Sequence, residues 1–160
     1  MPLIAELVST VRFGTLDVPK GASRPLEAAL RYLARDRRMR DVIERAERAR
    51  SPLHLRLNGR DDDSYEPWDR VVNWDPHSAL ATTSGGRQSP ALGLGHELAH
   101  AVEAPSLRDR YSAQAVPAYD DAEERRVIRG VESHAARTLG EGVRSDHDGT
   151  TYFVASPVAR

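Results

Sequence analysis

The sequence predicts a single α+β domain, and three observations support this fold class. The chain has 160 residues, a length that suits one ordinary domain with a buried core. Segments with the apolar periodicity of helices occur along it, and so do segments with the period-two alternation of strands. No internal repeat and no linker-like stretch divides the chain. We therefore expect one domain over residues 1–160, with residues 1–24 as a candidate N-terminal extension.

The first half of the chain is predicted to be helical and then extended. Apolar residues at helical spacing indicate a short helix near residues 3–11 and a long amphipathic helix over residues 25–50. Leucines alternate with polar residues at 53–57, as in a half-buried strand, and residues 70–74 form a second candidate strand. The polar loop between these two strands carries three aspartates at 61–63. They lack the spacing of a calcium-binding loop, so we interpret them as a solvated turn.

The second half of the chain is predicted to contain two further helices. A loop rich in glycine, serine and threonine covers residues 81–90. The helices follow near residues 91–104 and 122–139, and a loop that contains two prolines separates them. A short strand near residues 151–155 completes the predicted α+β order.

Composition excludes several classes of partner and chemistry. The formal net charge of −1 provides no overall field that would recruit nucleic acid or an anionic membrane. No apolar run approaches the ~20 residues of a membrane span. The N-terminus lacks the basic start of a classical signal peptide, so export would need another route or an origin in a longer chain. The chain has no cysteine, so a metal would be bound by histidine and carboxylate.

The five residues His96-Glu97-Leu98-Ala99-His100 form the most informative motif of the sequence. Residues four apart in a helix lie on the same face, so the two histidines present their imidazoles to one point. Such a pair suits two corners of a tetrahedral zinc site, and Glu97 can reach a water molecule there. Apolar neighbours would bury this helix, where histidines without a partner are costly. We predict a zinc-dependent hydrolase, and a protease in particular.

A catalytic zinc site needs a third protein ligand and an open position. The downstream candidates are Glu103, Glu123, Glu124, Glu132, His134 and His147. Glu124 lies one turn before Ile128 on the inward stripe of the predicted second helix, which favours it as the ligand. Glu123 remains an alternative, although it has a competing role in a capping box at the start of that helix. We expect Glu103 and Glu132 to be solvated or to lie behind the ligands.

Four stretches form a specific combination: Asn-Trp-Asp-Pro at 73–76, His-Glu-Leu-Ala-His-Ala at 96–101, Asp-Ala-Glu-Glu-Arg-Arg-Val-Ile at 121–128 and Gly-Val-Arg-Ser-Asp-His at 142–147. Together they resemble the bacterial effector zinc metallopeptidases, which are injected by type III secretion systems or carried as toxin domains of polymorphic secreted proteins. That family shares three features with clostridial neurotoxin light chains: a HExxH helix, a later Glu-Glu pair whose second member binds zinc, and an Arg-x-x-Tyr near the metal. The resemblance covers the chain from about residue 25 onward.

The resemblance implies a compact zincin-like metalloprotease domain, in which a small sheet packs on the HExxH helix and on a second, ligand-bearing helix. It implies that His96, His100 and Glu124 bind Zn²⁺ and that Glu97 is the catalytic base. Arg144 would take the place of the arginine that stabilises the transition state.

One departure from the family pattern concerns His147, which occupies the tyrosine position. Histidine can still donate a hydrogen bond to an oxyanion, so we expect His147 to keep that role with a different pH dependence. We also expect residues 71–74 to form the edge of the substrate cleft, where an extended peptide would pair with them. Asp75 or Asp120 would fix a zinc histidine from behind.

The resemblance also implies partners and a location. The expected substrate is a protein of a target cell, reached through a bacterial secretion system without a classical signal peptide; otherwise the protein stays in the cytoplasm. An immunity protein or a secretion chaperone is an expected partner. Nucleic acid and a membrane span are not expected. The sequence leaves open whether the chain is a free-standing effector or a domain excised from a longer toxin.

Two alternatives to this interpretation remain. The first is a regulatory intracellular metalloprotease that cleaves a repressor, whose helix also reads His-Glu-Leu-(Gly/Ala)-His-Ala. Residues 130–135 lack the Ala-Asn-x-Phe-Ala stretch that such proteases carry after their third ligand. The second is a non-enzymatic domain with a structural zinc ion. Such a closed site would need a fourth protein ligand, which His134 or His147 could supply.

Overall fold

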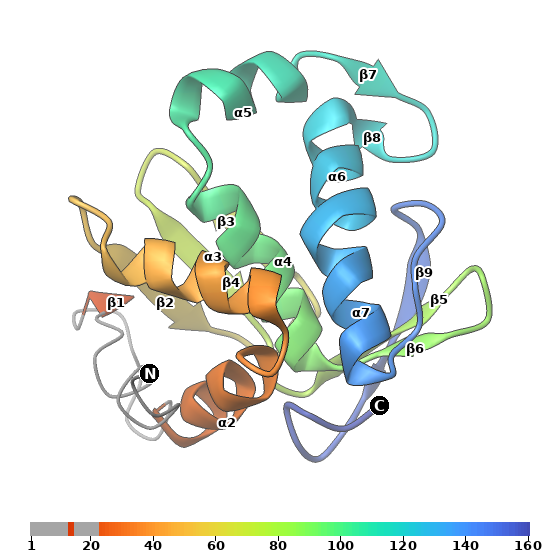
Figure 1. Cartoon of the computed structure of the whole chain (residues 1–160). Coiled ribbons are helices and arrows are strands. Elements are labelled where there is room, and N and C mark those ends of the chain that lie inside the picture. The colour runs from red at the N-terminus through yellow and green to blue at the C-terminus, as the bar shows by residue number, and fades with distance from the viewer. Residues whose placement is uncertain (1–12, 15–22) are drawn as a thin grey trace.

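The computed structural model describes residues 13–14 and 23–160, and it has a mixed α+β architecture (Figure 1). The predicted helix near residues 3–11 lies outside the described residues. In chain order the elements are β1 (Phe13–Gly14), α2 (Ser23–Leu33), α3 (Arg37–Glu47), β2 (Leu53–Leu57), β3 (Ser64–Glu66), β4 (Val71–Trp74), β5 (Ser78–Thr82), β6 (Arg87–Gln88), α4 (Pro90–Ala101), α5 (Pro105–Ser112), β7 (Ala115–Val116), β8 (Asp120–Asp121), α6 (Ala122–Val127), the π-helical turn η2 (Ile128–Glu132), α7 (Ser133–Leu139) and β9 (Gly149–Phe153). The predicted α+β class is confirmed.

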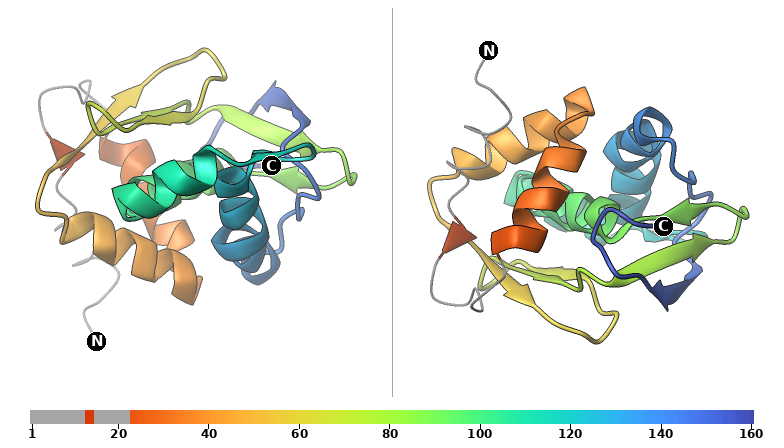
Figure 2. Two further views of the ribbon diagram at one scale, coloured as in Figure 1. Left: turned by 90° about the horizontal axis from the view of Figure 1, so that it is seen from above. Right: turned by 90° about the horizontal axis from the view of Figure 1, so that it is seen from below.

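Helix α4 is the centre of the molecule. The two larger sheets lie on one side of it and α2 and α3 on the other, while α6 and α7 run beside it (Figure 2). Ser89 caps its N-terminus by accepting a hydrogen bond from the backbone N–H of Leu92, and Pro90 occupies its first turn. Every residue of α4 except Gly93 is buried. Packing on all sides, more than helix propensity, therefore fixes the position of α4.

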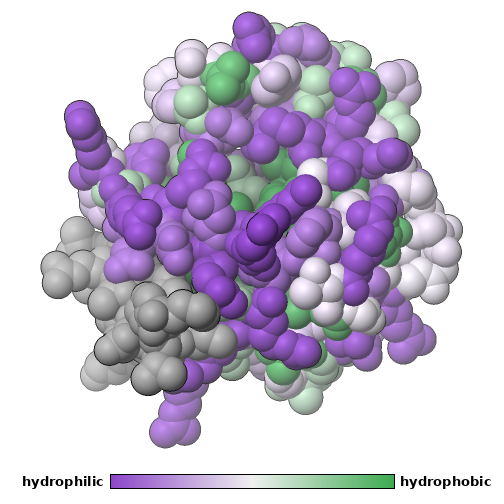
Figure 3. Space-filling view, in the orientation of Figure 1, coloured by the Kyte–Doolittle hydropathy of each residue, from purple (hydrophilic) through white to green (hydrophobic). Residues whose placement is uncertain are grey.

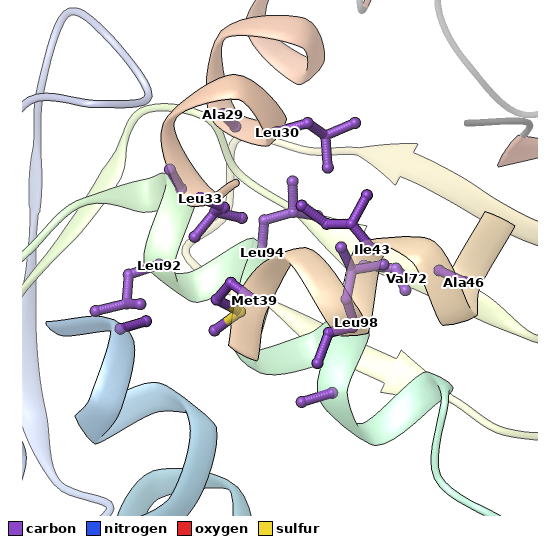
Figure 4. Close-up of a cluster of buried hydrophobic side chains, with 14 of the residues drawn as sticks. Ala29, Leu30, Leu33, Met39, Ile43, Ala46, Val72, Leu92, Leu94 and Leu98 are labelled. Carbon is purple, nitrogen blue, oxygen red and sulfur yellow. The ribbon is translucent and has the colours of Figure 1, made fainter. Parts of the chain in front are cut away.

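The hydrophobic core lies between α2, α3, α4 and the first sheet. Figure 4 shows its side chains converging from these elements, among them Leu33, Met39, Ile43, Val72 and Leu94. The approach of α3 to α4 depends on a glycine of α4. A Cβ at Gly95 would lie 2.7 Å from Cε of Met39, so a larger residue there would push the two helices apart.

The first sheet has the order β1-β2-β4-β3, with β1, β2 and β4 parallel and β3 antiparallel to β4. Strand β4 therefore has a partner on both sides. The prediction that residues 71–74 form the edge of the substrate cleft is wrong, because β3 occupies the edge position. The second sheet is antiparallel with the order β6-β5-β9, and β7 pairs with β8 in a small ribbon.

The predicted helix over residues 25–50 is two helices in the structure. The chain breaks between α2 and α3, where Asp36 accepts hydrogen bonds from the backbone N–H groups of Arg38 and Met39 at 2.9 Å each. The carboxylate of Asp36 is fully buried and caps α3. A short polar residue inside a helical pattern can start a new helix in this way, and the apolar periodicity on both sides hides the break.

Short elements in the predicted loops account for the other differences. Strand β3 lies in the polar loop after residue 57, β5 begins three residues before the loop at 81–90 and β6 lies inside it, and α5 lies in the loop before residue 122. Strands β3 and β6 carry too few residues for a periodic pattern to appear, and α5 has no apolar stripe because its buried residue is Arg108. The predicted strands at 53–57 and 70–74 and the helix at 91–104 are confirmed, and the last strand is confirmed with its start two residues earlier.

The helix predicted over residues 122–139 contains a π turn. The chain passes from α6 through η2 into α7, with an irregular backbone at Gly130 (φ −93°, ψ −106°). The hydroxyl of Ser133 donates to the carbonyl of Ile128 at 2.6 Å inside this turn. A π turn holds one residue more than an α turn, so the helix after it is rotated by about 100° relative to an uninterrupted helix. No helix within the described ranges is long and apolar enough to cross a membrane.

Candidate metal centre

Three predicted ligands meet where α4 passes α6. Nε2 of His96 lies 3.0 Å from Nε2 of His100 and 3.0 Å from Oε2 of Glu124. Nε2 of His100 lies 3.1 Å from Oε1 of Glu124. In a tetrahedral site with bonds of 2.0–2.1 Å, neighbouring ligand atoms lie about 3.3 Å apart. These three side chains form a buried group that could bind a metal ion.

The other nitrogen of each imidazole faces a carboxylate. Nδ1 of His96 lies 2.7 Å from Oε2 of Glu132, and Nδ1 of His100 lies 3.0 Å from Oε1 of Glu123. Each carboxylate favours a proton on Nδ1, which leaves the Nε2 lone pairs directed at one another and at Glu124. Two facing lone pairs and a carboxylate repel one another unless a cation or a proton lies between them. The donor set therefore suits a divalent cation.

Each of these two carboxylates is held in turn by an arginine. Arg144 binds Glu132 through two parallel hydrogen bonds, from Nε to Oε1 at 2.9 Å and from Nη2 to Oε2 at 2.6 Å. Arg126 binds Glu123 through Nε at 2.8 Å and Nη2 at 2.6 Å. Both histidines thus belong to a His–Glu–Arg chain. Such chains fix the tautomer and the orientation of a ligand before a metal binds.

The π turn explains how Glu132 reaches His96. Glu124 and Glu132 are eight residues apart, which places them about 80° apart around a regular α-helix. The additional residue of the π turn makes the spacing equivalent to seven residues, so the two side chains lie within about 20° of one another. They bind opposite nitrogens of the same imidazole. Sequence reasoning placed Glu132 among residues that are solvated or behind the ligands; it is 1% exposed and lies behind His96.

Charges within the cluster shift the pKa values of its members. With no cation bound, burial opposes the imidazolium of His96, but hydrogen bonds to Glu124 and Glu132 outweigh burial and raise its pKa to about 10. Burial likewise opposes the carboxylate of Glu132, and hydrogen bonds from His96 and Arg144 lower its pKa to about 2. The same kind of contacts from the two histidines hold the pKa of Glu124 well below its usual range. Hydrogen bonds to Glu123 and Glu124 likewise outweigh burial and raise the pKa of His100, so the carboxylates favour positive charge at the centre of the group.

Glu97 is placed differently from the other carboxylates. Its Oε1 lies 4.0 Å from Nε2 of His96, and no hydrogen bond from the described part of the chain reaches its carboxylate. Burial raises its pKa, and the neighbouring histidines only partly offset that effect. Its side chain lines the cavities on both sides of the metal group. A carboxylate with a raised pKa in an open cleft has the properties of a general base.

His147 stands at the mouth of the same cleft. Its Nδ1 lies 2.7 Å from Oδ2 of Asp120, and its Nε2 lies 3.5 Å from Oε2 of Glu124. Asp120 adopts a left-handed backbone conformation (φ 67°), which is unusual for a residue other than glycine. The expectation that Asp75 or Asp120 fixes a zinc histidine is wrong. Asp120 holds His147, while the carboxylate of Asp75 accepts the backbone N–H of His77 at 2.9 Å.

The cleft consists of two cavities that share Asp63, Glu97 and His147. The first has a volume of about 240 Å³ and is also lined by Arg144; the second has a volume of about 400 Å³ and is bordered by strand β3. The side chain of Arg144 is buried, and its Nη1 lies 3.4 Å from the carbonyl of His147. The cleft therefore runs past the metal group on both sides.

Asp63 is a member of the site that sequence reasoning missed. The run at 61–63 was interpreted as a solvated turn, and only Asp61 and Asp62 are exposed. Oδ1 of Asp63 accepts the backbone N–H of Asp75 at 2.7 Å. Burial, together with the charge of Glu97, raises the pKa of Asp63 to about 8. No periodic signal marks such a residue in the sequence, because its burial depends on the approach of α4.

Two other candidate ligands lie elsewhere. His134 binds Oδ2 of Asp36 through Nδ1 at 2.7 Å, on the side of α7 that faces α3. Glu103 pairs with Arg126 at 3.2 Å. His134 is therefore not the fourth ligand of a closed site. Among the described residues, the ligand atoms that lie within 4.8 Å of one another come from His96, His100 and Glu124, without His147.

Comparison with known proteins adds no relative. No protein-family model, no curated protein and no solved structure matches the chain. The functional assignment therefore depends on the geometry of the site and on the motifs in the sequence.

Proposed function

We propose that the chain is a zinc-dependent endopeptidase with a compact zincin-like fold. One observation carries the proposal above all. Three ligand atoms meet beside an open cleft, and Glu97 projects into that cleft without a hydrogen-bond partner among the described residues. A closed structural site would have four protein ligands and no need of a free carboxylate. Two imidazoles and one carboxylate with an open fourth position form a ligand set that occurs in catalytic zinc sites.

Zinc in this place would polarise a substrate carbonyl and acidify a water molecule. Glu97 is the residue that accepts a proton in the cleft, because its pKa is raised and its carboxylate is free. The same carboxyl group then donates that proton to the leaving amine. The Arg144 guanidinium keeps Glu132 ionised through its two hydrogen bonds, and it adds positive charge to the wall of the first cavity.

His147 is a further residue that we assign to the reaction, as a hydrogen-bond donor. Its Nδ1 is directed at Asp120, so its Nε2 carries a proton towards the cleft only when the ring is an imidazolium. In that form it would donate a hydrogen bond to the oxygen of the attacked carbonyl. This arrangement supports His147 as a hydrogen-bond donor to that oxygen. A tyrosine hydroxyl in its place would donate without first having to take up a proton.

Strand β3 supports a peptide as the substrate. It is the edge strand of its sheet, and Ser64 and Tyr65 border the second cavity next to Asp63. An extended peptide could add to that edge by main-chain hydrogen bonds and run across the metal group. We infer from the motif resemblance that the peptide belongs to a target-cell protein and that the enzyme is a secreted effector or toxin.

The proposal is tested by zinc content and by peptide cleavage measured together. Elemental analysis of the purified protein should find about one zinc per chain, and His100→Ala and Glu124→Ala should lose it. Glu97→Gln should retain the zinc. A library of peptides from a digested proteome, analysed by mass spectrometry, should then show new termini with the wild type and none with Glu97→Gln.

Two outcomes would refute the peptidase. The first is a zinc-loaded wild type that leaves the whole library intact, which would favour a structural or binding role for the metal. The second is cleavage by Glu97→Gln at the wild-type rate. Glu103→Gln is the matched control, because it makes the same chemical change at a carboxylate that contacts only Arg126 among the described side chains.

A further inference from the structure

A second concave surface lies on the other side of α4 from the cleft. It is a groove of about 480 Å³ between α3, α4 and the α6–η2 helix, and it shares no lining residue with the two cavities of the cleft. Its lining residues are Arg37, Arg38, Asp41, Val42, Arg45, Ala99, Val102, Arg126 and Val131. Figure 3 shows hydrophobic surface between hydrophilic side chains near the centre of this face.

The groove combines an apolar floor with a basic rim. Val42 and Ala99 are buried on the floor, and Val102 and Val131 are half-buried. The rim carries four arginines against one aspartate, on a protein whose net charge is −1. The positive charge is therefore a local feature of this surface and not a property of the whole chain.

Three of the four arginines have no carboxylate partner within the described part of the chain. Arg126 is bound to Glu123 and Glu103, and Arg45 donates to the carbonyl oxygen of Val102 at 2.7 Å. Among residues 13–14 and 23–160, no ion pair within 4.0 Å involves Arg37, Arg38 or Arg45. A ligand that entered the groove would meet the guanidinium groups of Arg37 and Arg38, and that of Arg45, whose hydrogen bond to Val102 leaves its charge without a carboxylate.

Arg37 and Arg38 occupy the first turn of α3, where the N-cap Asp36 is the adjacent acidic residue. The N-terminus of a helix carries a partial positive charge, so cations are unfavourable there. The carboxylate of Asp36 is buried and accepts the backbone N–H groups of Arg38 and Met39, so it offsets the helix end. The positive charge at this end of the groove therefore comes from the exposed side chains of Arg37 and Arg38.

We propose that this groove binds an acidic, amphipathic segment of a partner protein. The carboxylates of the segment pair with the arginines of the rim, and its apolar side chains cover the valine floor. In a helical segment of this kind, apolar residues repeat at i, i+4 spacing along one face and acidic residues repeat at the same spacing beside them. Nucleic acid fits less well, because single strands bind through aromatic stacking and no aromatic side chain lines the groove.

The test uses the full-length protein and a fluorescein-labelled amphipathic helical peptide, with glutamates on one face and leucines on the other. Anisotropy is measured in about 0.15 M salt, where the Debye length of about 8 Å suppresses long-range attraction. Wild-type protein should bind saturably. Arg37→Glu combined with Arg38→Glu should weaken binding about tenfold or more, because the double variant replaces two attractive charges with two repulsive ones.

The control combines Arg48→Glu with Arg50→Glu, which makes the same change in net charge at two residues that do not line the groove. It should change the affinity by no more than about twofold, and circular dichroism should show that both double variants are folded. Replacing the leucines of the peptide with serine should abolish binding. The proposal is overturned by equal losses in both double variants, by a wild type that does not bind the peptide, or by a single-stranded oligonucleotide that displaces it.

Discussion

Replacing Glu132 with glutamine removes one negative charge from behind His96 and leaves the side-chain volume almost unchanged. The carboxylate receives four hydrogen bonds: from Nδ1 of His96 at 2.7 Å, from Arg144 at 2.9 and 2.6 Å, and from Nε2 of Gln88 at 2.9 Å. An amide keeps one acceptor oxygen, and its nitrogen must face a donor. Either His96 or Arg144 then loses its partner in the protein interior.

The size of the effect follows from these contacts. Breaking a buried ion pair by removing one partner costs about 3–5 kcal/mol, so we expect the free energy of unfolding to fall by about 3 kcal/mol. At about 2–4 °C per kcal/mol for a chain of this size, the melting temperature should fall by about 6–12 °C. Loss of a carboxylate behind a metal-binding histidine lowers metal affinity about 10- to 100-fold, or about 1.4–2.7 kcal/mol.

Two measurements on Glu132→Gln separate orientation of the ligand from packing. Zinc affinity is measured by competition with a chelator indicator, and stability by thermal unfolding of the metal-free protein. Glu103→Gln is the control, and both quantities should stay within about 1 kcal/mol of wild type because Glu103 is half-buried and has one ionic contact. If Glu132→Gln lowered the melting temperature but left zinc affinity unchanged, Glu132 would serve the packing of the core and would not orient His96.

Three other outcomes are expected. Glu124→Ala should lose zinc, whereas Glu123→Ala should retain it with about 10- to 100-fold lower affinity, as shown by dialysis against chelator. If Glu123→Ala lost zinc and Glu124→Ala retained it, Glu123 would be the ligand and Glu124 the carboxylate that supports a histidine. Zinc must displace the proton of His96, whose pKa the hydrogen bonds to Glu124 and Glu132 raise to about 10, so zinc affinity should rise about tenfold per pH unit for each proton released between pH 6 and 8, and calorimetry in two buffers should detect that proton. Deleting Gly130 should turn the π turn into a regular α turn and leave a seven-residue spacing that keeps Glu132 within about 20° of Glu124, so zinc affinity should stay within about threefold of wild type; a loss as large as in Glu132→Gln would mean that the π turn does not set the phase of Glu132.

The central part of the fold could be predicted because its patterns are long. Helix α4 and the strands at 53–57 and 70–74 follow from apolar periodicity and from alternation, which depend only on which face of an element is buried. The break at Asp36 could not be predicted in this way. The residues on both sides of it continue one helical stripe, and only the hydrogen bonds of the buried carboxylate mark the start of a second helix.

The same distinction applies to the site. The convergence of His96, His100 and Glu124 followed from helix phase, because the stretch from Glu124 to the π turn is regular α-helix. Beyond that turn the phase changes, so a regular-helix argument misplaces Glu132 by about 100°. Asp63 was missed for a different reason. Its neighbour across space is Gly93, where a Cβ would lie 2.7 Å from Oδ2 of Asp63, and such a contact joins segments 30 residues apart in the chain.

The location of Glu124 has a consequence for the part of the chain that precedes it. Between residues 102 and 121, which include α5 and the β7–β8 ribbon, only Arg108 and Tyr119 are buried. This segment has little core of its own, and its two ends are anchored by His100 and Glu124. A metal ion bound to both residues would close a loop of 24 residues, which restricts the unfolded ensemble in the way that a disulfide bridge does. The metal would therefore hold residues 102–121 against the rest of the protein. Chelation should expose α5 and the ribbon to limited proteolysis at temperatures where α4 and the sheets remain folded.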